Sequence, residues 1–314
     1  MKAMVITANG GPEVFQAQDL PMPEPAPNQL LVEVHAVSVN PIDYKLRRTG
    51  ALGYGPGSVL GFDAAGVVKK TGAAVRDFKV GDEVFYCPDF SGPGAYAQFH
   101  VTDAGIVALK PSHLSFIEAA AVPLTAMTAW DGVIERGGLK IGQSILIHGA
   151  SGGVGSWAVQ LAHVAGAYVF GTCSAPNAAM VRSLGADYVI DRQKQDFAEI
   201  VRQETAGEGV DVVYDCFGGD VVARSIPLVK PLGRIVTIVD PGGDLSLGYR
   251  KNISIHYEFL RRKREYLLAL KSLLERRVIK PVISRVLSLE QVAEAHRTLE
   301  NGGGFGKIVL TVRQ

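Results

Sequence analysis

Hydrophobic residues alternate with polar ones in several short runs in the first part of the chain. Up to about Val122, short runs of alternating apolar and polar residues occur at Leu30–Ser38, Gly61–Lys69 and Val80–Tyr86. A proline-rich connector at Pro21–Pro27 and several turn-like stretches separate them. Alternation with a period of two is typical of half-buried strands. This part is therefore predicted to be a twisted, largely antiparallel β module.

The spacing changes after Pro123, where strand-like runs alternate with helical stretches. These runs are Ser144–His148, Tyr168–Thr172, Tyr188–Ile190, Val210–Tyr214, Arg234–Val239 and Ile253–Phe259. Such alternation predicts a doubly wound α/β domain, with a parallel sheet and helices on both faces.

The tail has two helical segments, Glu265–Arg277 and Leu289–Glu300, and a closing strand at Gly306–Leu310. Because it is too short for a core of its own, we expect it to return to the first module. The predicted domains are residues 1–122 with 261–314, and residues 123–260.

A glycine-rich loop follows the first strand of the α/β domain. The apolar run Ile145–Ile147 breaks into Gly149–Gly155 and continues with helical spacing. Glycine is needed where a strand turns tightly into a helix and where the backbone touches a pyrophosphate, which the helix N-terminus then stabilises. We therefore expect a dinucleotide to bind Ser151, Gly152, Gly153 and Val154; the alternative is a glycine-rich turn without a ligand.

The next strand indicates whether NAD(H) or NADP(H) binds. In NAD sites an acidic residue about 20 residues further on holds the ribose 2′-hydroxyl, but no Asp or Glu occurs between Gly155 and Asp187. The strand ends instead at Gly171–Ser174, which leaves room and a hydroxyl donor for a 2′-phosphate. NADP(H) is predicted over NAD(H).

Composition limits the classes of partner. With 32 basic and 31 acidic residues the formal net charge is +1, so no overall field attracts nucleic acid or an anionic membrane, and no apolar run has membrane-spanning length. Three widely separated cysteines predict neither a disulfide framework nor a metal clamp and favour a reducing compartment, the cytoplasm. The basic run Arg261–Arg264 is interpreted as a solvated helix face, and His148 as a structural histidine.

Sequence markers run through nearly the whole chain. They are Ser38–Asp43, Gly61–Val68, Val80–Val84, Gly94–Ala97, Thr128–Trp130, the glycine loop, Leu184–Asp187, Tyr214–Gly218 and Gly306–Lys307. In this order they resemble the zinc-free quinone oxidoreductase (zeta-crystallin-like) branch of the medium-chain dehydrogenase/reductases. The resemblance implies a Rossmann domain, a discontinuous GroES-like catalytic domain, hydride transfer from NADPH to a quinone or α,β-unsaturated carbonyl, and a homodimer paired along Ile253–Phe259.

Zinc-dependent members of that family hold a catalytic metal at three places. Here those places are Asn40, Phe62 and the apolar stretch Val122–Leu124, none of which can bind zinc. The four-cysteine structural lobe would fall between Tyr86 and Tyr96, where Cys87 is the sole cysteine. No metal site is expected.

The resemblance also implies catalytic residues. Asn40 would contact the nicotinamide ribose or the substrate oxygen, with a turn-capping role as the alternative, and Asp43 would organise the same turn. Tyr54, on a mobile-looking loop, is a candidate proton donor; a surface tyrosine is the alternative. We expect Lys45 to be solvated.

Further residues are candidates for binding the cofactor: Thr128, Ser174, Asn177, Arg192, Phe217, Val239 and Lys307. For Thr128, Phe217 and Val239 the alternative is ordinary core packing. Arg192 would supply positive charge to the 2′-phosphate, and an exposed arginine without a ligand is its alternative. An enoyl-thioester reductase and a non-catalytic NADP(H)-binding protein are alternative functions, because no local rule links the substrate loops to one acceptor.

Overall fold

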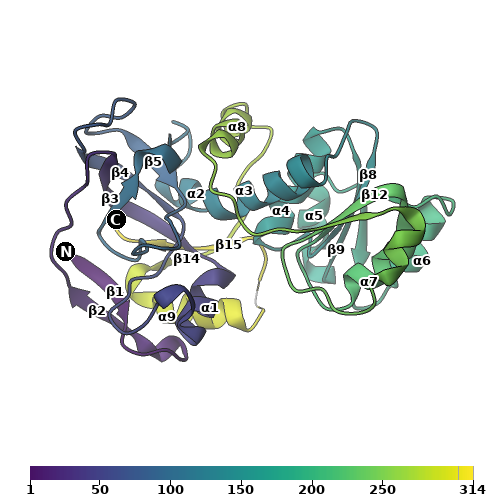
Figure 1. Cartoon of the computed structure of the whole chain (residues 1–314), viewed down its shortest axis with the longest axis horizontal. Coiled ribbons are helices and arrows are strands. Elements are labelled where there is room, and N and C mark those ends of the chain that lie inside the picture. The colour runs from purple at the N-terminus through teal and green to yellow at the C-terminus, as the bar shows by residue number, and fades with distance from the viewer. Residues whose placement is uncertain (303, 314) are drawn as a thin grey trace. The chain divides into compact units, whose positions relative to one another are not determined.

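The computed structural model describes residues 1–302 and 304–313, which form two compact units (Figure 1). The discontinuous unit comprises Met1–Leu124 and Arg262–Gln314, and the central unit comprises Thr125–Arg261.

The discontinuous unit is built on β3 (Gln29–Val39), the strand with the most partners. It pairs antiparallel with β4 (Ala64–Thr71), β6 (Phe99–Asp103) and β15 (Lys307–Thr311) in a seven-stranded sheet of order β14-β15-β3-β4-β5-β7. The other strands are β5 (Glu83–Tyr86), β7 (Val107–Leu109) and β14 (Ile283–Ser288), with β1 (Lys2–Ile6) and β2 (Phe15–Asp19) in a separate antiparallel pair. Pairing of β15 with β3 confirms that the tail returns to the first module.

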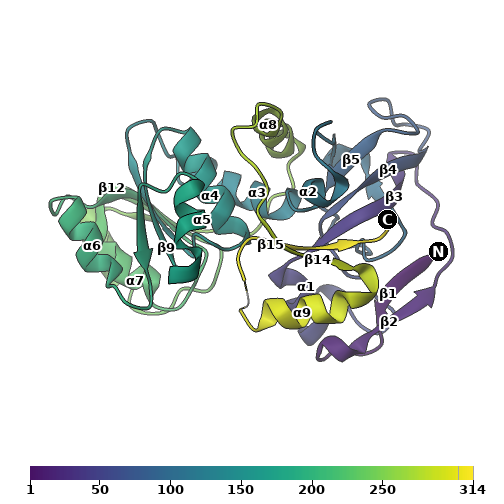
Figure 2. The ribbon, with the colours of Figure 1, turned by 180° about the vertical axis from the view of Figure 1, so that it is seen from behind.

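The helices of this unit are α1 (Pro41–Thr49), α2 (Phe116–Ala120), α8 (Arg264–Glu275) and α9 (Val292–Glu300). α9 runs beside α1 (Figure 2). Along α8, Tyr266, Leu267, Leu270 and Leu274 are buried, the spacing of a single apolar helix face.

The interpretation of Arg261–Arg264 as a solvated helix face is wrong. α8 begins only at Arg264, and the arginines extend to carboxylates: Arg262 pairs with Asp89 at 3.0 Å and Arg264 with Asp77 at 2.8 Å. Arg261, in the central unit, pairs with Asp131. The backbone at Lys263 is extended and only Arg264 is helical, so these guanidinium groups do not share one helix face.

The central unit contains a parallel six-stranded sheet of order β10-β9-β8-β11-β12-β13. The strands are β8 (Ser144–His148), β9 (Tyr168–Cys173), β10 (Tyr188–Asp191), β11 (Val210–Asp215), β12 (Val229–Thr237) and β13 (Ser254–Tyr257). The chain runs outward from β8 to β10, then returns to β11 and runs to the other edge. The predicted doubly wound sheet is confirmed, and its order reverses between β8 and β11.

Helices cover both faces of this sheet: α4 (Gly153–Val164) and α5 (Ala178–Ser183) lie on one side, α6 (Phe197–Glu204) and α7 (Val221–Ser225) on the other (Figures 1 and 2). Between the sheet and α6 and α7 lies a core that includes Leu146, Val213 and Ile235. α3 (Pro123–Trp130) continues into a π-helical turn, Asp131–Arg136.

Short 3₁₀ turns complete the structure. They are Pro12–Val14, Ala51–Gly53, Ala104–Ile106, Ala175–Asn177, Ile226–Leu228, Ser246–Lys251 and Leu289–Gln291.

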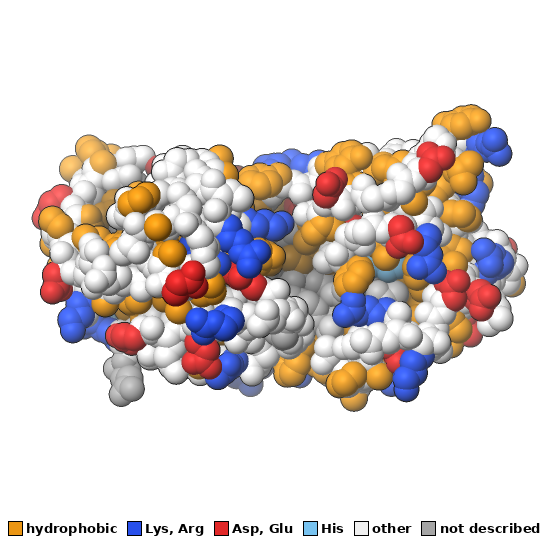
Figure 3. All heavy atoms as spheres, turned by 90° about the horizontal axis from the view of Figure 1, so that it is seen from below, with side chains coloured by type: hydrophobic (Ala, Val, Ile, Leu, Met, Phe, Trp, Pro, Cys, Tyr) orange, Lys and Arg blue, Asp and Glu red, His pale blue; other side chains and the backbone are white. Residues whose placement is uncertain are grey.

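Acidic and basic side chains are interspersed on the face seen in Figure 3, in agreement with the balanced net charge. Within residues 1–302 and 304–313, no helix combines the length and low polarity needed to cross a bilayer.

Candidate functional site

The glycine loop lies at the carboxyl end of β8, where the sheet order reverses. Gly149 adopts a φ of +73°, and Gly152 caps the N-terminus of α4. A Cβ on Gly155 would lie 2.1 Å from the carbonyl oxygen of Gly149, so helix and loop approach too closely for any side chain. A Cβ on Gly152 would meet just one described atom within 4 Å, the same oxygen at 3.3 Å. Gly155 is thus needed for packing. Gly152 leaves space beside its Cα, but its N–H donates to the Gly149 carbonyl and its own carbonyl accepts from the Ser156 N–H, each at 2.9 Å. It therefore offers a ligand room, not hydrogen bonds.

Three predicted cofactor residues come together beside this loop. The side-chain amide of Asn177 donates to Ser151 Oγ at 3.2 Å and to Ser174 Oγ at 3.3 Å. All three are half-buried, and Ser174 directly follows β9. The end of β9 therefore presents neutral hydrogen-bonding groups, which accommodate a phosphate without the repulsion of a carboxylate.

Arg192 and Phe217 contact each other at the same edge of the sheet. The guanidinium carbon of Arg192 lies 4.5 Å from the centre of the Phe217 ring, and the ring is 50% exposed. These residues follow β10 and β11, which are separated in the sheet by β9 and β8. The side chains therefore bridge the carboxyl ends of two intervening strands.

Thr128 and Val239 lie by the other half of the sheet. Thr128 is buried in α3, and its carbonyl oxygen accepts a hydrogen bond from the Tyr214 hydroxyl at 3.2 Å. Val239 is half-buried beyond the end of β12, which stops at Thr237 and not at Val239 as predicted. His148 is buried with its Nε2 2.9 Å from Ser225 Oγ, which confirms the structural interpretation.

Asn40 belongs to a buried polar cluster in the discontinuous unit. It is fully buried at the N-cap of α1, and its amide nitrogen donates to Asp63 Oδ2 at 2.8 Å. Lys307 Nζ donates to Asn40 Oδ1, to Asp63 Oδ2 at 3.2 Å and to the Val39 carbonyl at 3.1 Å. Asp63 also accepts from Ser38 Oγ and from the Leu124 backbone N–H, each at 2.7 Å.

This cluster changes how Asn40 and Lys307 are understood. The carbonyl and one N–H of the Asn40 amide are used inside the cluster, and an ammonium group has three N–H donors, all of which Lys307 uses there. One amide hydrogen of Asn40 is therefore not used by this cluster, and Lys307 holds the Asn40 side chain in place.

Asp43 organises the turn before α1, as the resemblance implied. Its carboxylate accepts from the Asn40 backbone N–H at 2.6 Å and from the Gly61 N–H at 3.2 Å. Burial raises the pKa of Asp43 to about 7, although the hydrogen bond from Asn40 and the charge of Lys307 act in the opposite direction.

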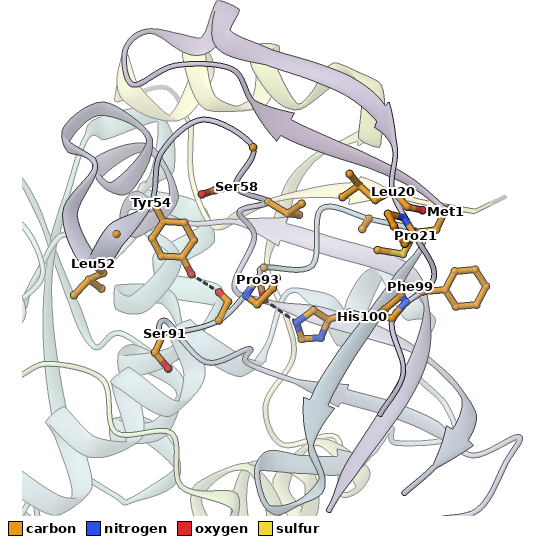
Figure 4. A pocket seen from close by; sticks show the side chains of 17 residues that line it. Met1, Leu20, Pro21, Leu52, Tyr54, Ser58, Ser91, Pro93, Phe99 and His100 are labelled. Atoms are coloured by element: carbon orange, nitrogen blue, oxygen red, sulfur yellow. Dashed lines mark hydrogen bonds between the residues drawn. The ribbon is translucent and has the colours of Figure 1, made fainter. Parts of the chain in front are cut away.

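Tyr54 is not a surface tyrosine, so that alternative is wrong. It is 6% exposed, lines a pocket of about 440 Å³ and donates its hydroxyl hydrogen to the Gly92 carbonyl (Figure 4). Burial and the nearby Asp43 and Asp89 carboxylates raise the pKa of Tyr54 to about 12. The phenol is therefore not at the surface, and its hydroxyl hydrogen is donated to Gly92 in this structure; its role as a proton donor stays a prediction. Lys45 is exposed, as expected.

Phe62 occupies a position where zinc-dependent relatives have a ligand. It is fully buried, with Tyr54 edge-on at 5.8 Å and Phe90 edge-on at 4.9 Å between ring centres. Across the described residues, no group of three or more His, Cys, Asp or Glu side chains has metal-binding geometry.

Two functional candidates escaped the sequence reasoning. Asp63 lay within a recognised marker without an assigned role, and Glu258 lay in a predicted apolar strand. The available signal was the same for both: a carboxyl group in an apolar run is rarely buried without a partner.

Comparison with known proteins adds independent evidence. Residues 26–112 match the alcohol dehydrogenase GroES-like domain, and residues 184–310 match a family described as zinc-binding dehydrogenase. The chain is 36% identical to 2-methylene-furan-3-one reductase of Solanum lycopersicum, over 99% of this chain and 79% of that protein. It is 30% identical to quinone oxidoreductase of Homo sapiens, over 99% and 97% of the two chains.

Among solved structures, Escherichia coli quinone oxidoreductase complexed with NADPH superposes with a TM-score of 0.88 and 31% identity, covering 99% of this chain and 100% of that one. The chain therefore belongs to the medium-chain dehydrogenase/reductase superfamily, in its quinone oxidoreductase branch.

Proposed function

We propose that this protein transfers a hydride from NADPH to a quinone or an α,β-unsaturated carbonyl compound and that it does so without zinc. The observation that carries the proposal is the pairing of an open glycine loop with the group Ser151, Ser174 and Asn177, in which no carboxylate occurs. The reductase and quinone oxidoreductase names of the relatives, and the NADPH in the related structure, support it.

The residues of the central unit fit NADPH. The backbone N–H groups of Gly153 and Val154 would hold the pyrophosphate at the N-terminus of α4, and Gly152 would leave room for it. The Ser151 and Ser174 hydroxyl groups, which Asn177 holds through its two amide hydrogens, would donate to the 2′-phosphate. Arg192 would add the positive charge, since a guanidinium group pairs with phosphate in a forked geometry. When bound, NADPH supplies the hydride from its dihydropyridine ring.

The residues do not fit zinc. At two of the family's three catalytic ligand positions stand Asn40, whose amide oxygen is held by Lys307, and Phe62, which has no ligand atom. Val122–Leu124 at the third is apolar. The buried Cys87 is the sole cysteine between Tyr86 and Tyr96.

A quinone or an α,β-unsaturated carbonyl acceptor suits a site without a metal. A conjugated acceptor takes hydride at its β-carbon and moves the charge to oxygen, where hydrogen-bond donors stabilise it. The remaining amide hydrogen of Asn40 is the proposed donor toward this oxygen or the nicotinamide ribose.

The test is NADPH oxidation with a panel of quinones, short enals, enones and enoyl thioesters, together with metal analysis of the purified protein. We expect turnover of quinones or enones by protein that lacks stoichiometric zinc. Exclusive turnover of enoyl thioesters would favour the carrier-linked alternative, and turnover of none would favour a binding protein.

We also propose a homodimer paired along β13. This strand is the last in the sheet order, its outer edge is unpaired within the described chain, and Tyr257 is 62% exposed. Unpaired strand edges favour association with another strand. A monomeric mass in light scattering would contradict this. The three unpaired cysteines support a cytoplasmic location.

A further inference from the structure

Glu258 is a buried acid at the carboxyl edge of the central sheet. It follows β13, its backbone N–H donates to the Thr237 carbonyl at the end of β12 at 2.9 Å, and it is 7% exposed. Its Oε2 lies 3.1 Å from the Tyr214 hydroxyl, which in turn lies 3.2 Å from the Thr128 carbonyl oxygen. Three side-chain and backbone groups thus link β13, β11 and α3.

The hydrogen count of this link determines the protonation state of Glu258. A phenol has one hydrogen to donate. With an ionised Glu258, Tyr214 would face two acceptors, and one contact would be repulsive. With a protonated Glu258, the acid donates to Tyr214 and Tyr214 donates to Thr128, so both contacts are hydrogen bonds.

The other carboxyl oxygen leads to the same conclusion. Glu258 Oε1 is buried and has no hydrogen-bond partner among the described residues. An unpaired carbonyl oxygen of a neutral acid costs far less free energy than an unpaired carboxylate oxygen in the same place.

The charges around Glu258 agree with this. Burial and the Asp131 carboxylate raise the pKa of Glu258 to about 8, against the Tyr214 hydrogen bond and the charges of Arg136 and Arg261. Asp131 itself is paired with both arginines. The Cys216 thiol and the Tyr214 phenol also lie nearby, and burial raises the pKa of both groups.

The contacts that join Glu258, Tyr214 and Thr128 lie in the half of the sheet formed by β11 to β13, away from Ser174 and Asn177. Dinucleotides bind across the point where the strand order reverses, with one end over each half of the sheet. Ser174 and Asn177 follow β9 in one half, so the ends of β11 to β13 would receive the other end of the cofactor.

We propose that Glu258, in its neutral form, is a positioning residue that holds Tyr214 and the Thr128 segment in the arrangement that binds NADPH. The proposal rests on the proposed function. Loss of the Glu258 proton would break the link and place a charge at the carboxyl end of β13, where the proposed cofactor would bind, so NADPH affinity would fall at alkaline pH.

The experiment is NADPH binding, measured by fluorescence without acceptor from pH 7 to 9.5. If only the neutral acid binds, the wild-type Kd rises by up to about 30-fold over this range, since the upper limit is 1.5 pH units above the titration midpoint. Glu258→Gln has an N–H that donates to Tyr214 and a carbonyl oxygen, so it should bind like wild type at pH 7 and remain independent of pH. Tyr214→Phe should bind about 5-fold more weakly at pH 7 because the link to Thr128 is lost.

The matched control is Glu199→Gln, an exposed position on α6, which should retain the wild-type pH profile. A pH-independent wild type, an alkaline loss that persists in Glu258→Gln, or weak binding by Glu258→Gln at pH 7 would each overturn the proposal. Infrared difference spectra of wild type against Glu258→Gln provide a readout without cofactor. If NADPH fails to bind at any pH while the protonated carboxyl band is present at pH 7, the proposed function fails and the neutral acid stands; absence of that band refutes the neutral acid.

Discussion

Two alanine substitutions in the glycine loop should affect different properties. Gly155→Ala should reduce the stability of the fold, and Gly152→Ala should reduce the affinity for NADPH. In Gly155→Ala the new Cβ would lie 2.1 Å from the Gly149 carbonyl oxygen and 2.9 Å from Ala150 Cα. Backbone atoms must therefore move, and overpacking of this kind costs about 1–3 kcal/mol of unfolding free energy. In Gly152→Ala the closest described atom lies at 3.3 Å, and the φ of −74° is allowed for alanine. That variant should lose less stability than Gly155→Ala, because the Gly149 carbonyl oxygen needs to move by only a few tenths of an ångström.

NADPH affinity should be reduced in Gly152→Ala. In Gly152→Ala the new methyl group would occupy the space through which a pyrophosphate approaches the backbone. NADPH affinity should therefore fall at least about 10-fold, or about 1.4 kcal/mol. The stability assay is urea unfolding followed by tryptophan fluorescence, because Trp130 and Trp157 are the two tryptophans of the chain and both lie in the central unit. Wild-type NADPH affinity in Gly152→Ala, or wild-type stability in Gly155→Ala, would refute this division of roles.

Four other predictions concern single side chains. Lys307→Met leaves Asp63 and Asn40 without a buried cation, so unfolding free energy should fall by about 3–5 kcal/mol; unchanged urea unfolding by circular dichroism would contradict the cluster. Arg192→Ala should weaken NADPH binding about 10-fold and reduce its salt dependence, with NADH affinity unchanged; equal losses for both cofactors would place Arg192 elsewhere. Tyr54→Phe should cost about 1 kcal/mol through the lost hydrogen bond to Gly92 and retain turnover; a loss of turnover without a loss of stability would restore the proton-donor role. Because the folded pKa of Glu258 exceeds its unfolded value, the native state retains a proton that the unfolded state loses, so from pH 5 to 8 wild-type stability should fall by a few kcal/mol relative to Glu258→Gln; parallel stability profiles would contradict this sign.

Local patterns predicted the architecture well. The period-two runs and the alternation of strands with helices depend on which face of each element is buried, and this information lies within short windows of sequence. The strand Ser144–His148 has the predicted bounds. β12 begins five residues earlier than predicted, at Val229, because its first residues include Pro231 and Gly233, which weaken a strand pattern.

The site was predicted less completely because its contacts are long-range. Lys307 and Asp63 are 244 residues apart in sequence, and no periodicity brings them together. Arg192 and Phe217 meet only because the sheet is parallel, so that β10 and β11 both end at its carboxyl edge, and because only β9 and β8 lie between them. The glycine loop and the missing acidic residue were readable since both act within one βαβ unit.

The central claim is tested most directly by kcat/KM for NADPH and for NADH with an enone acceptor, measured on protein dialysed against a chelator and checked for metal. The account predicts full activity without metal and a preference for NADPH of about 100-fold, given that a charge-assisted phosphate contact and two neutral ones contribute together. Equal use of NADH, or activity that returns only when zinc is added, would contradict it.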